Sequence, residues 1–155
     1  MTVRRALLGA AFAAAIVAVQ PGAAAAAPVL ANDPPSADAA CLINASGVMT
    51  CFSTAAAMQT QASAGPETTC PLFLYSGADY TGRLLQIDAQ GYWLNLSDYD
   101  FADTTVAFAG TGCGFHLAQY DYGGGYWYPG NTGPWALCPN MGAGWDDAVA
   151  SVYVD

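Results

Sequence analysis

An internal repeat in the second half of the chain constrains the fold more than any other feature. The segment YSGADYTG carries two aromatic residues and a glycine at a fixed spacing, at Tyr75, Tyr80 and Gly82. The segment LAQYDYGG repeats that spacing forty-two residues later, at Leu117, Tyr122 and Gly124. Because a repeated segment predicts a repeated structural unit, we expect two similar units that follow each other along the chain.

Two further matches extend the repeat toward the C-terminus. Gly91 and Trp93 recur as Gly133 and Trp135, and the segment 101–103 recurs as 145–147 before a final strand. Short aromatic-rich segments between glycine turns predict four strands in each copy, with the glycine after the second aromatic residue at positive φ. Neither copy carries enough apolar surface to be stable alone, so we expect two sheets that pack face to face.

The repeat resembles the signature of the βγ-crystallin family, which is aromatic-x4-aromatic-x-Gly. Tyr75, Tyr80 and Gly82 match this signature fully, and the second copy has Leu117 in place of the first aromatic residue. The resemblance covers residues 70–155. It implies an all-β, βγ-crystallin-like sandwich of two Greek-key motifs, with motif one at 70–112 and motif two at 113–155.

The arrangement of the whole chain resembles secreted actinobacterial proteins that are grouped with the microbial metalloproteinase inhibitors. That resemblance implies a secreted, non-enzymatic binding protein of the peptidase-inhibitor type, with a secreted protease as its partner. No residue of the reactive region of those inhibitors has a match in this chain. We therefore infer a partner-binding loop from the residues alone: the segment GGGYWYPGNTGPWALC contains Trp127, Tyr128 and Trp135, and its two prolines restrict the backbone.

The N-terminal residues predict export. Arg4 and Arg5 precede an apolar stretch and a run of alanines, which is the pattern of a signal peptide spanning residues 1–27. Residues 28–40 are rich in Pro, Ala and Asp and are predicted to form a flexible linker. No later segment is long and apolar enough to cross a membrane, so we expect a secreted protein without a membrane partner. We also expect it to be a monomer.

Net charge excludes one class of partner. After removal of the signal peptide, twelve acidic side chains oppose a single basic side chain, that of Arg83, and no lysine is present. Binding to nucleic acids depends on Lys and Arg side chains that displace counterions from the phosphates. We therefore expect no nucleic-acid partner.

Residues 41–69 are predicted to form a small extension before the repeats. Cys41 and Cys51 lie at the two ends of the hairpin-like sequence CLINASGVMTC, so we expect a disulfide across this hairpin. The sequence STAAAMQTQASA then predicts a short helix, with Ser53 or Thr54 as its N-cap.

Three cysteines remain for the repeats. In a Greek-key motif the first and last strands pair antiparallel, so the start of one strand lies beside the end of the other. Cys70 precedes the first strand of motif one and Cys113 follows the last. We therefore predict a Cys70–Cys113 disulfide and an unpaired Cys138.

The βγ-crystallin resemblance also implies a calcium loop, (Asn/Asp)-(Asn/Asp)-x-x-(Ser/Thr)-Ser, before the last strand of each motif. The second copy keeps both acidic residues, Asp146 and Asp147, whereas the first copy keeps only Asp103. The hydroxyl at the fifth position is missing from both copies, at Val106 and Ala150. Since Ca²⁺ requires several oxygen ligands at once, we expect the aspartates to shape turns, with no cofactor required and calcium bound no tighter than millimolar.

No arrangement of residues predicts an enzyme. His116 lies in the alternating run GFHLAQY, which predicts a strand position, and Asp98 and Asp100 lack the cleft that a pair of glycosidase carboxylates requires. Two alternatives to peptidase inhibition remain: a calcium-stabilised extracellular structural or stress protein, and a glycan-binding module that uses exposed Trp127 and Trp135. The other two tryptophans, Trp93 and Trp145, are predicted to lie in the core.

Overall fold

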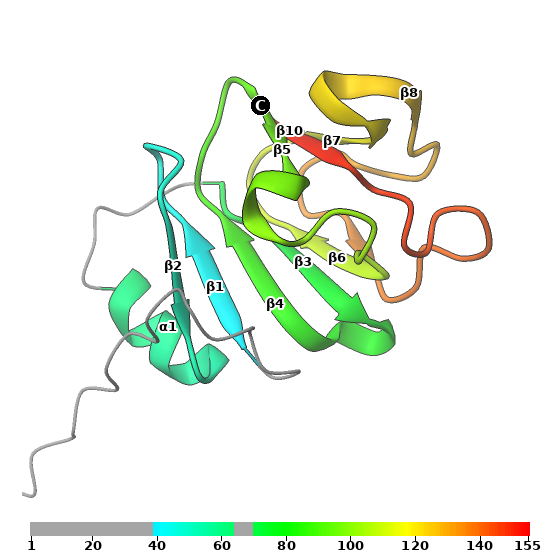
Figure 1. Cartoon of the computed structure of the whole chain (residues 1–155). Coiled ribbons are helices and arrows are strands. Elements are labelled where there is room, and N and C mark those ends of the chain that lie inside the picture. Colours follow the sequence, from blue (N-terminus) through cyan, green and yellow to red (C-terminus); the bar gives the residue numbers. More distant parts are fainter. Residues whose placement is uncertain (1–38, 64–69) are drawn as a thin grey trace, which may run out of the picture.

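The computed structural model describes residues 39–63 and 70–155, so the predicted signal peptide and most of the predicted linker lie outside the described residues. An extension of two strands and one helix comes first (Figure 1): β1 (Ala40–Ile43), β2 (Met49–Phe52) and α1 (Ala55–Ala62). The first repeat contains β3 (Leu72–Gly77), β4 (Thr81–Ile87), β5 (Trp93–Asn95) and β6 (Ala107–Gly110). The second repeat contains β7 (Phe115–Tyr120), β8 (Gly124–Trp127), β9 (Leu137–Cys138) and β10 (Ser151–Val154).

The strands form two sheets, and the two repeats exchange one strand between them. Sheet A has the strand order β2-β1-β4-β3-β6-β9, and sheet B has the order β5-β10-β7-β8. Each repeat places its first, second and fourth strands in one sheet and its third strand, β5 or β9, in the sheet of the other repeat. This arrangement confirms the expected all-β, βγ-crystallin-like sandwich, in which neither repeat is complete without the other.

The hydrophobic core lies between the two sheets. Among the largest fully buried side chains are Phe101, Phe108 and Phe115, and the rings of Phe108 and Phe115 meet edge to face with their centroids 5.1 Å apart. Trp145 is partly buried and packs against this core, as predicted. Trp93 does not belong to the core, so that prediction is wrong: Leu94 is the residue of β5 that faces the core, and the alternation of a strand then turns Trp93 to the outer face.

Strand pairing in the first half of each repeat corrects the alignment read from the sequence. The hairpin of the first repeat pairs Gly77 with Thr81, and the hairpin of the second repeat pairs Tyr120 with Gly124. The two repeats are therefore related by 43 residues here rather than by 42. The tyrosine that matched by its identity, Tyr122, is one position away from the structural equivalent of Tyr80.

The second half of each repeat is related by 44 residues. Ala109 pairs with Leu137 in sheet A, and Tyr153 pairs with Trp93 in sheet B. Trp93 therefore corresponds to Leu137, and not to Trp135 as the sequence match indicated. The predicted correspondence of the segments 101–103 and 145–147 does hold, because 44 residues separate them.

The N-terminal extension enlarges sheet A and covers part of its outer face. Strand β1 pairs antiparallel with β2 and parallel with β4, so Ala40, assigned above to the linker, is a buried strand residue. Thr54, one of the two predicted N-caps, begins α1, and its Oγ1 accepts a hydrogen bond of 3.2 Å from the amide of Ala57. Met58 of α1 is fully buried against the outer face of sheet A. Within the described residues, no helix has the length and apolar character needed to cross a membrane.

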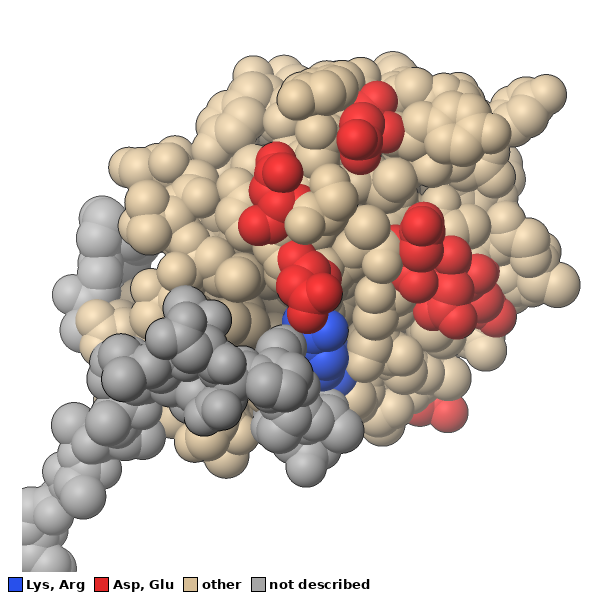
Figure 2. All heavy atoms as spheres, in the orientation of Figure 1, with Lys and Arg blue, Asp and Glu red and all other residues tan. Residues whose placement is uncertain are grey.

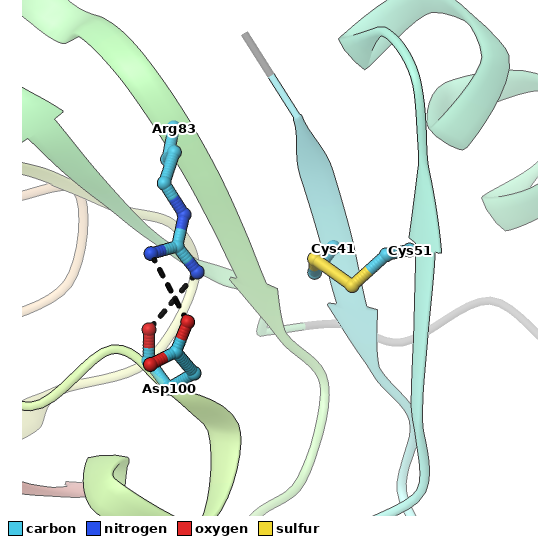
Figure 3. Close-up of a disulfide and its surroundings, with 4 residues drawn as sticks. All are labelled: Cys41, Cys51, Arg83 and Asp100. Atoms are coloured by element: carbon cyan, nitrogen blue, oxygen red, sulfur yellow. Dashed lines mark hydrogen bonds and ion pairs between the residues drawn. A yellow bond between two sulfur atoms is a disulfide. The ribbon is translucent and has the colours of Figure 1, made fainter. Parts of the chain in front are cut away.

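Both predicted disulfides are present. Cys41 and Cys51 are direct partners across the β1–β2 hairpin (Figure 3). The second disulfide joins Cys70 to Cys113 and links the start of β3 to the segment after β6, as the antiparallel pairing of these strands requires. Cys138 on β9 is the free cysteine among the described residues.

Candidate binding surfaces

The first repeat folds its hairpin around a tyrosine pair. The rings of Tyr75 and Tyr80 meet edge to face with their centroids 5.5 Å apart, and Gly82 has a positive φ of 76°, as predicted. Ser76 supports the fold, because its Oγ accepts a 2.8 Å hydrogen bond from the amide of Arg83. Burial, and next the neighbouring Tyr80, raise the pKa of Tyr75.

The second repeat has no such tyrosine pair. The positions that correspond to the signature are Ala118, Gly123 and Gly125. Gly123 and Gly125 have φ values of 78° and 75°, whereas Gly124, which was predicted to have a positive φ, has a φ of −73°. The prediction for Gly124 is therefore wrong, because the hairpin is shifted by one residue.

Two buried polar side chains of sheet B hold this second hairpin in place. The Oδ1 atom of Asn95 accepts a 2.9 Å hydrogen bond from the amide of Tyr122. The hydroxyl of Ser151 accepts a 3.0 Å hydrogen bond from the amide of Gly123 and donates one of 2.6 Å to the carbonyl of Tyr120. These bonds fix the hairpin on the outer face of sheet B.

An aromatic cluster occupies the rest of that face, and we define it as Trp93, His116, Trp127 and Tyr153. Their ring centroids are separated by 5.6 Å (Trp93–Trp127), 5.6 Å (Trp93–Tyr153), 4.9 Å (His116–Trp127) and 6.1 Å (His116–Tyr153). Trp127 is 51% exposed, as predicted, and its Nε1 donates a 2.8 Å hydrogen bond to the carbonyl of Gly123. His116 is on strand β7, as predicted, but its place in a cluster was not foreseen.

Trp135 lies between β8 and β9 and is the most unusual residue of the predicted partner-binding loop. Its side chain is 72% exposed, and its φ of 64° lies in the left-handed region that few non-glycine residues adopt. Its structural equivalent in the first repeat is Gly91, with a φ of 80°. The amide of Trp135 donates a 2.7 Å hydrogen bond to the carbonyl of Thr111, so this backbone is held firmly.

Tyr128, the third residue predicted to contact a partner, points away from the surface. Its ring packs edge to face on Phe108 and on Trp145, with centroid distances of 5.5 Å and 5.3 Å. Its hydroxyl lies 3.4 Å from the Sγ of Cys138. Burial, followed by the hydrogen bond and the charge of Cys138 and then by the charge of Asp146, raises the pKa of Tyr128 to about 12. We conclude that Tyr128 supports the loop from below.

The predicted calcium loops are two turns that lie against each other. Asp103 and Asp147 have φ values of 51° and 56°, and their amides bond reciprocally to the opposite loop, at the carbonyls of Val149 (3.0 Å) and Thr105 (3.1 Å). Both aspartates and Asp121 line a depression of about 710 Å³. The two loops are therefore joined to each other through their backbones.

The adjacent aspartates of the second loop diverge. Asp147 lines the depression, whereas Asp146 does not, and a buried Oδ1 atom of Asp146 has no hydrogen-bond partner. Within residues 39–63 and 70–155, no group of three or more His, Cys, Asp or Glu side chains is arranged to hold a metal ion. Asp103, Asp146 and Asp147 are therefore not brought together as one set of ligands.

The remaining aspartates considered above have other surroundings. Asp100 pairs with Arg83: Oδ2 of Asp100 lies 3.6 Å from Nη1 of Arg83, whose Nη2 donates a 2.9 Å hydrogen bond to the carbonyl of Asp100 (Figure 3). Asp98 is exposed in the turn of residues 96–99, which follows β5. Both carboxylates therefore lie exposed at the surface of this turn.

Comparisons with solved structures find βγ-crystallin domains. A βγ-crystallin from Ciona intestinalis superposes with a TM-score of 0.46 at 18% identity, over 55% of this chain and 99% of that chain. A βγ-crystallin from an archaeon gives a TM-score of 0.46 at 14% identity, over 56% of this chain and 99% of that chain. A βγ-crystallin domain from Clostridium beijerinckii gives 0.45 at 18% identity, over 54% and 95%. No family model matches the sequence, and no curated protein matches it significantly.

Proposed function

We propose that this chain is a secreted, non-enzymatic binding protein of the peptidase-inhibitor type, anchored to its partner by Trp135. One observation carries the proposal: an exposed tryptophan stands where the equivalent position of the first repeat has a glycine. A left-handed backbone conformation is about 1–2 kcal/mol less favourable for a residue with a side chain than for glycine. Such strain commonly marks a functional position, because selection for stability alone favours glycine there.

The surroundings of Trp135 suit an anchor that is ordered before binding. The next residue, Ala136, is buried, and its amide and carbonyl bond to Gly133 (3.1 Å) and Gly110 (2.8 Å). Tyr128 packs beneath the same loop, against Phe108. A loop that is already fixed loses little conformational entropy when it binds, and exposed tryptophans are frequent energetic centres of protein interfaces.

The class of partner comes from the resemblance rather than from the loop. Proteins of similar arrangement are grouped with metalloproteinase inhibitors, so the first partner to test is a thermolysin-type protease. Among the strands of the described residues, β9 forms the edge of sheet A, and Leu137 on it is exposed, two residues after Trp135. An unpaired edge with an adjacent tryptophan can accept an extended segment of a protease by adding a strand.

Titration of the protein against proteases tests this proposal. The wild-type protein should slow a thermolysin-type enzyme at micromolar concentration, with a subtilisin-type serine protease tested in parallel. Trp135→Ala should weaken inhibition at least about tenfold, as expected for a central anchor. Val48→Ala, which removes a 58% exposed side chain from the N-terminal hairpin, should leave inhibition unchanged.

Two results would count against the proposal in different ways. If the wild-type protein slows neither protease, then the inhibitor function is wrong. If it inhibits and Trp135→Ala inhibits equally well, then the function stands but the anchor is misplaced.

A further inference from the structure

The internal repeat relates each position on the outer face of sheet A to a position on the outer face of sheet B. The two faces differ in the elements that cover them. In sheet A, Phe73 and Leu84 pack in a cluster with Met58, so helix α1 and the extension shield them. The equivalent positions of sheet B are His116 and Trp127. Figure 1 shows α1 beside β1 and β2, while sheet B lies at the other end of the molecule. No helix of the described residues covers the aromatic cluster.

The same comparison shows that sheet B carries a ring at each of four equivalent positions, whereas sheet A carries only the ring of Phe73. The remaining two members of the aromatic cluster, Trp93 and Tyr153, correspond to Leu137 and Ala109 in sheet A. Each ring of the cluster contacts two others at tilted angles of 37–53°. The rings therefore offer several differently inclined π faces rather than one flat surface. Inclined rings can receive a cation from more than one side.

The charges around these rings favour a cation. Oδ1 of Asp155 lies 3.6 Å from Nε2 of His116, so a carboxylate borders the aromatic cluster directly. Residues 39–63 and 70–155 carry nine aspartates and one basic side chain, that of Arg83, which is occupied by Asp100. Figure 2 shows acidic side chains in several separate groups on one face and a single basic patch. Such a distribution attracts cationic partners and repels a second copy of the chain.

We propose that the aromatic cluster and Asp155 form a binding site for arginine side chains of a basic polypeptide. A guanidinium group stacks on aromatic rings and also bonds to a carboxylate through two parallel N–H groups. The cluster provides the rings, and Asp155, whose side chain is 53% exposed, provides an accessible carboxylate beside them. The site does not include Trp135, the proposed anchor, so it does not depend on peptidase inhibition.

The probe is a short synthetic peptide of alternating arginine and glycine, and its control is the same peptide with citrulline in place of arginine. Citrulline keeps the shape of the side chain and removes its charge. Calorimetric titration at low ionic strength should show binding of the arginine peptide, with the citrulline peptide at least about tenfold weaker. A soluble neutral oligosaccharide is titrated in parallel.

Two variants and one control locate the site. Trp127→Ala and Asp155→Asn should each weaken binding of the arginine peptide about fivefold, which corresponds to the loss of one exposed cation–π or carboxylate contact. Asp79→Asn removes the same charge from the hairpin of the first repeat and keeps a residue that tolerates its φ of 54°. This control should bind the peptide as the wild type does. Unchanged far-UV circular dichroism establishes that each variant is folded.

Several outcomes would overturn the inference. Equal binding of the arginine and citrulline peptides would show that charge is not recognised. Equal weakening by Asp155→Asn and Asp79→Asn would show that only the net charge matters and that no site exists. Binding of the oligosaccharide with loss in Trp127→Ala, without binding of the arginine peptide, would make the aromatic cluster a glycan site instead. A dimer abolished by Trp127→Ala would assign the face to self-association.

Discussion

Replacement of Gly123 by alanine tests whether the aromatic cluster and the second hairpin are packed as described. Gly123 has a φ of 78°, and a Cβ atom there would overlap the Cε2 and Cζ2 atoms of the Trp93 indole. That ring cannot move aside freely, because it is packed against Trp127 and Tyr153 with centroid distances of 5.6 Å. The substitution should therefore introduce both backbone strain and a steric clash.

Gly91 supplies the matched control, because it separates the two effects. It has a φ of 80°, and a Cβ atom there would meet nothing within 4 Å. Gly91→Ala should lower the free energy of unfolding by about 1 kcal/mol. A left-handed alanine destabilises the folded state by about 1–2 kcal/mol, and the lower conformational entropy of the unfolded chain offsets about 0.4–1 kcal/mol of this. Gly123→Ala should cost about 2–4 kcal/mol, because forcing a methyl group into a packed region adds about 1–3 kcal/mol.

Thermal unfolding followed by circular dichroism measures the difference. At about 4 °C per kcal/mol, Gly91→Ala should lower Tm by about 4 °C and Gly123→Ala by about 8–16 °C. In a Trp93→Ala background the additional cost of Gly123→Ala should disappear, since the clashing ring is absent. Equal shifts for the two single variants, or no rescue by Trp93→Ala, would refute the packing of Trp93 on this hairpin.

Three further predictions follow from the site residues and the disulfides. Calcium at 1 mM should raise Tm by less than about 2 °C, because a millimolar site contributes about 0.4 kcal/mol at equimolar ligand and Kd; a shift of many degrees would reveal an intact calcium site. The double variant Cys70→Ser/Cys113→Ser should lose about 4 kcal/mol in urea unfolding, because the disulfide closes a loop of 43 residues; a loss below about 1 kcal/mol would contradict this. The pKa of Tyr128 is raised to about 12 in the folded state. Burial of the neutral phenol should therefore stabilise the fold fully below the unfolded pKa of about 10, and this stabilisation should be lost as the pH rises from about 10 to 12. The free energy of unfolding of Tyr128→Phe should not show this pH-dependent loss.

The sequence predicted the architecture because the signals for it are local. Alternating apolar residues and glycine turns specify strands, and the cysteines at both ends of β1–β2 specify a hairpin. The Cys70–Cys113 disulfide could be predicted because antiparallel strands place their opposite ends together. These inferences need only the spacing of residues along the chain.

The correspondence between the repeats could not be read correctly from residue identities. The two hairpins correspond by their backbone conformation, because Gly82 and Gly125 both have a positive φ. The comparison of residue identities had instead matched Gly82 with Gly124. The run of three glycines at 123–125 left that choice open. Trp135 was aligned with Trp93 for a similar reason, because a tryptophan is not expected at a position that calls for glycine.

The location of Trp93 required knowledge of the strand exchange. As a repeat residue with a large ring it was assigned to the core, but Leu94 is the residue of β5 that faces the core. Because β5 lies in sheet B, the outward ring of Trp93 packs on Gly123 of the other repeat. The aromatic cluster draws its members from four strands of both repeats, so no spacing in the sequence indicates it. The exposure of Trp127 and Trp135, by contrast, could be predicted from their position in a segment rich in glycine and proline.

The order of the Trp135 backbone is the most direct test of the proposed anchor, and ¹⁵N relaxation measures it without any partner. The hydrogen bond from its amide to Thr111 and the burial of Ala136 hold this segment as firmly as a strand. We expect an order parameter of about 0.85 for the Trp135 amide, equal to that of the central strands. A value below about 0.6 would show a mobile loop, and a mobile loop would contradict an anchor fixed before binding.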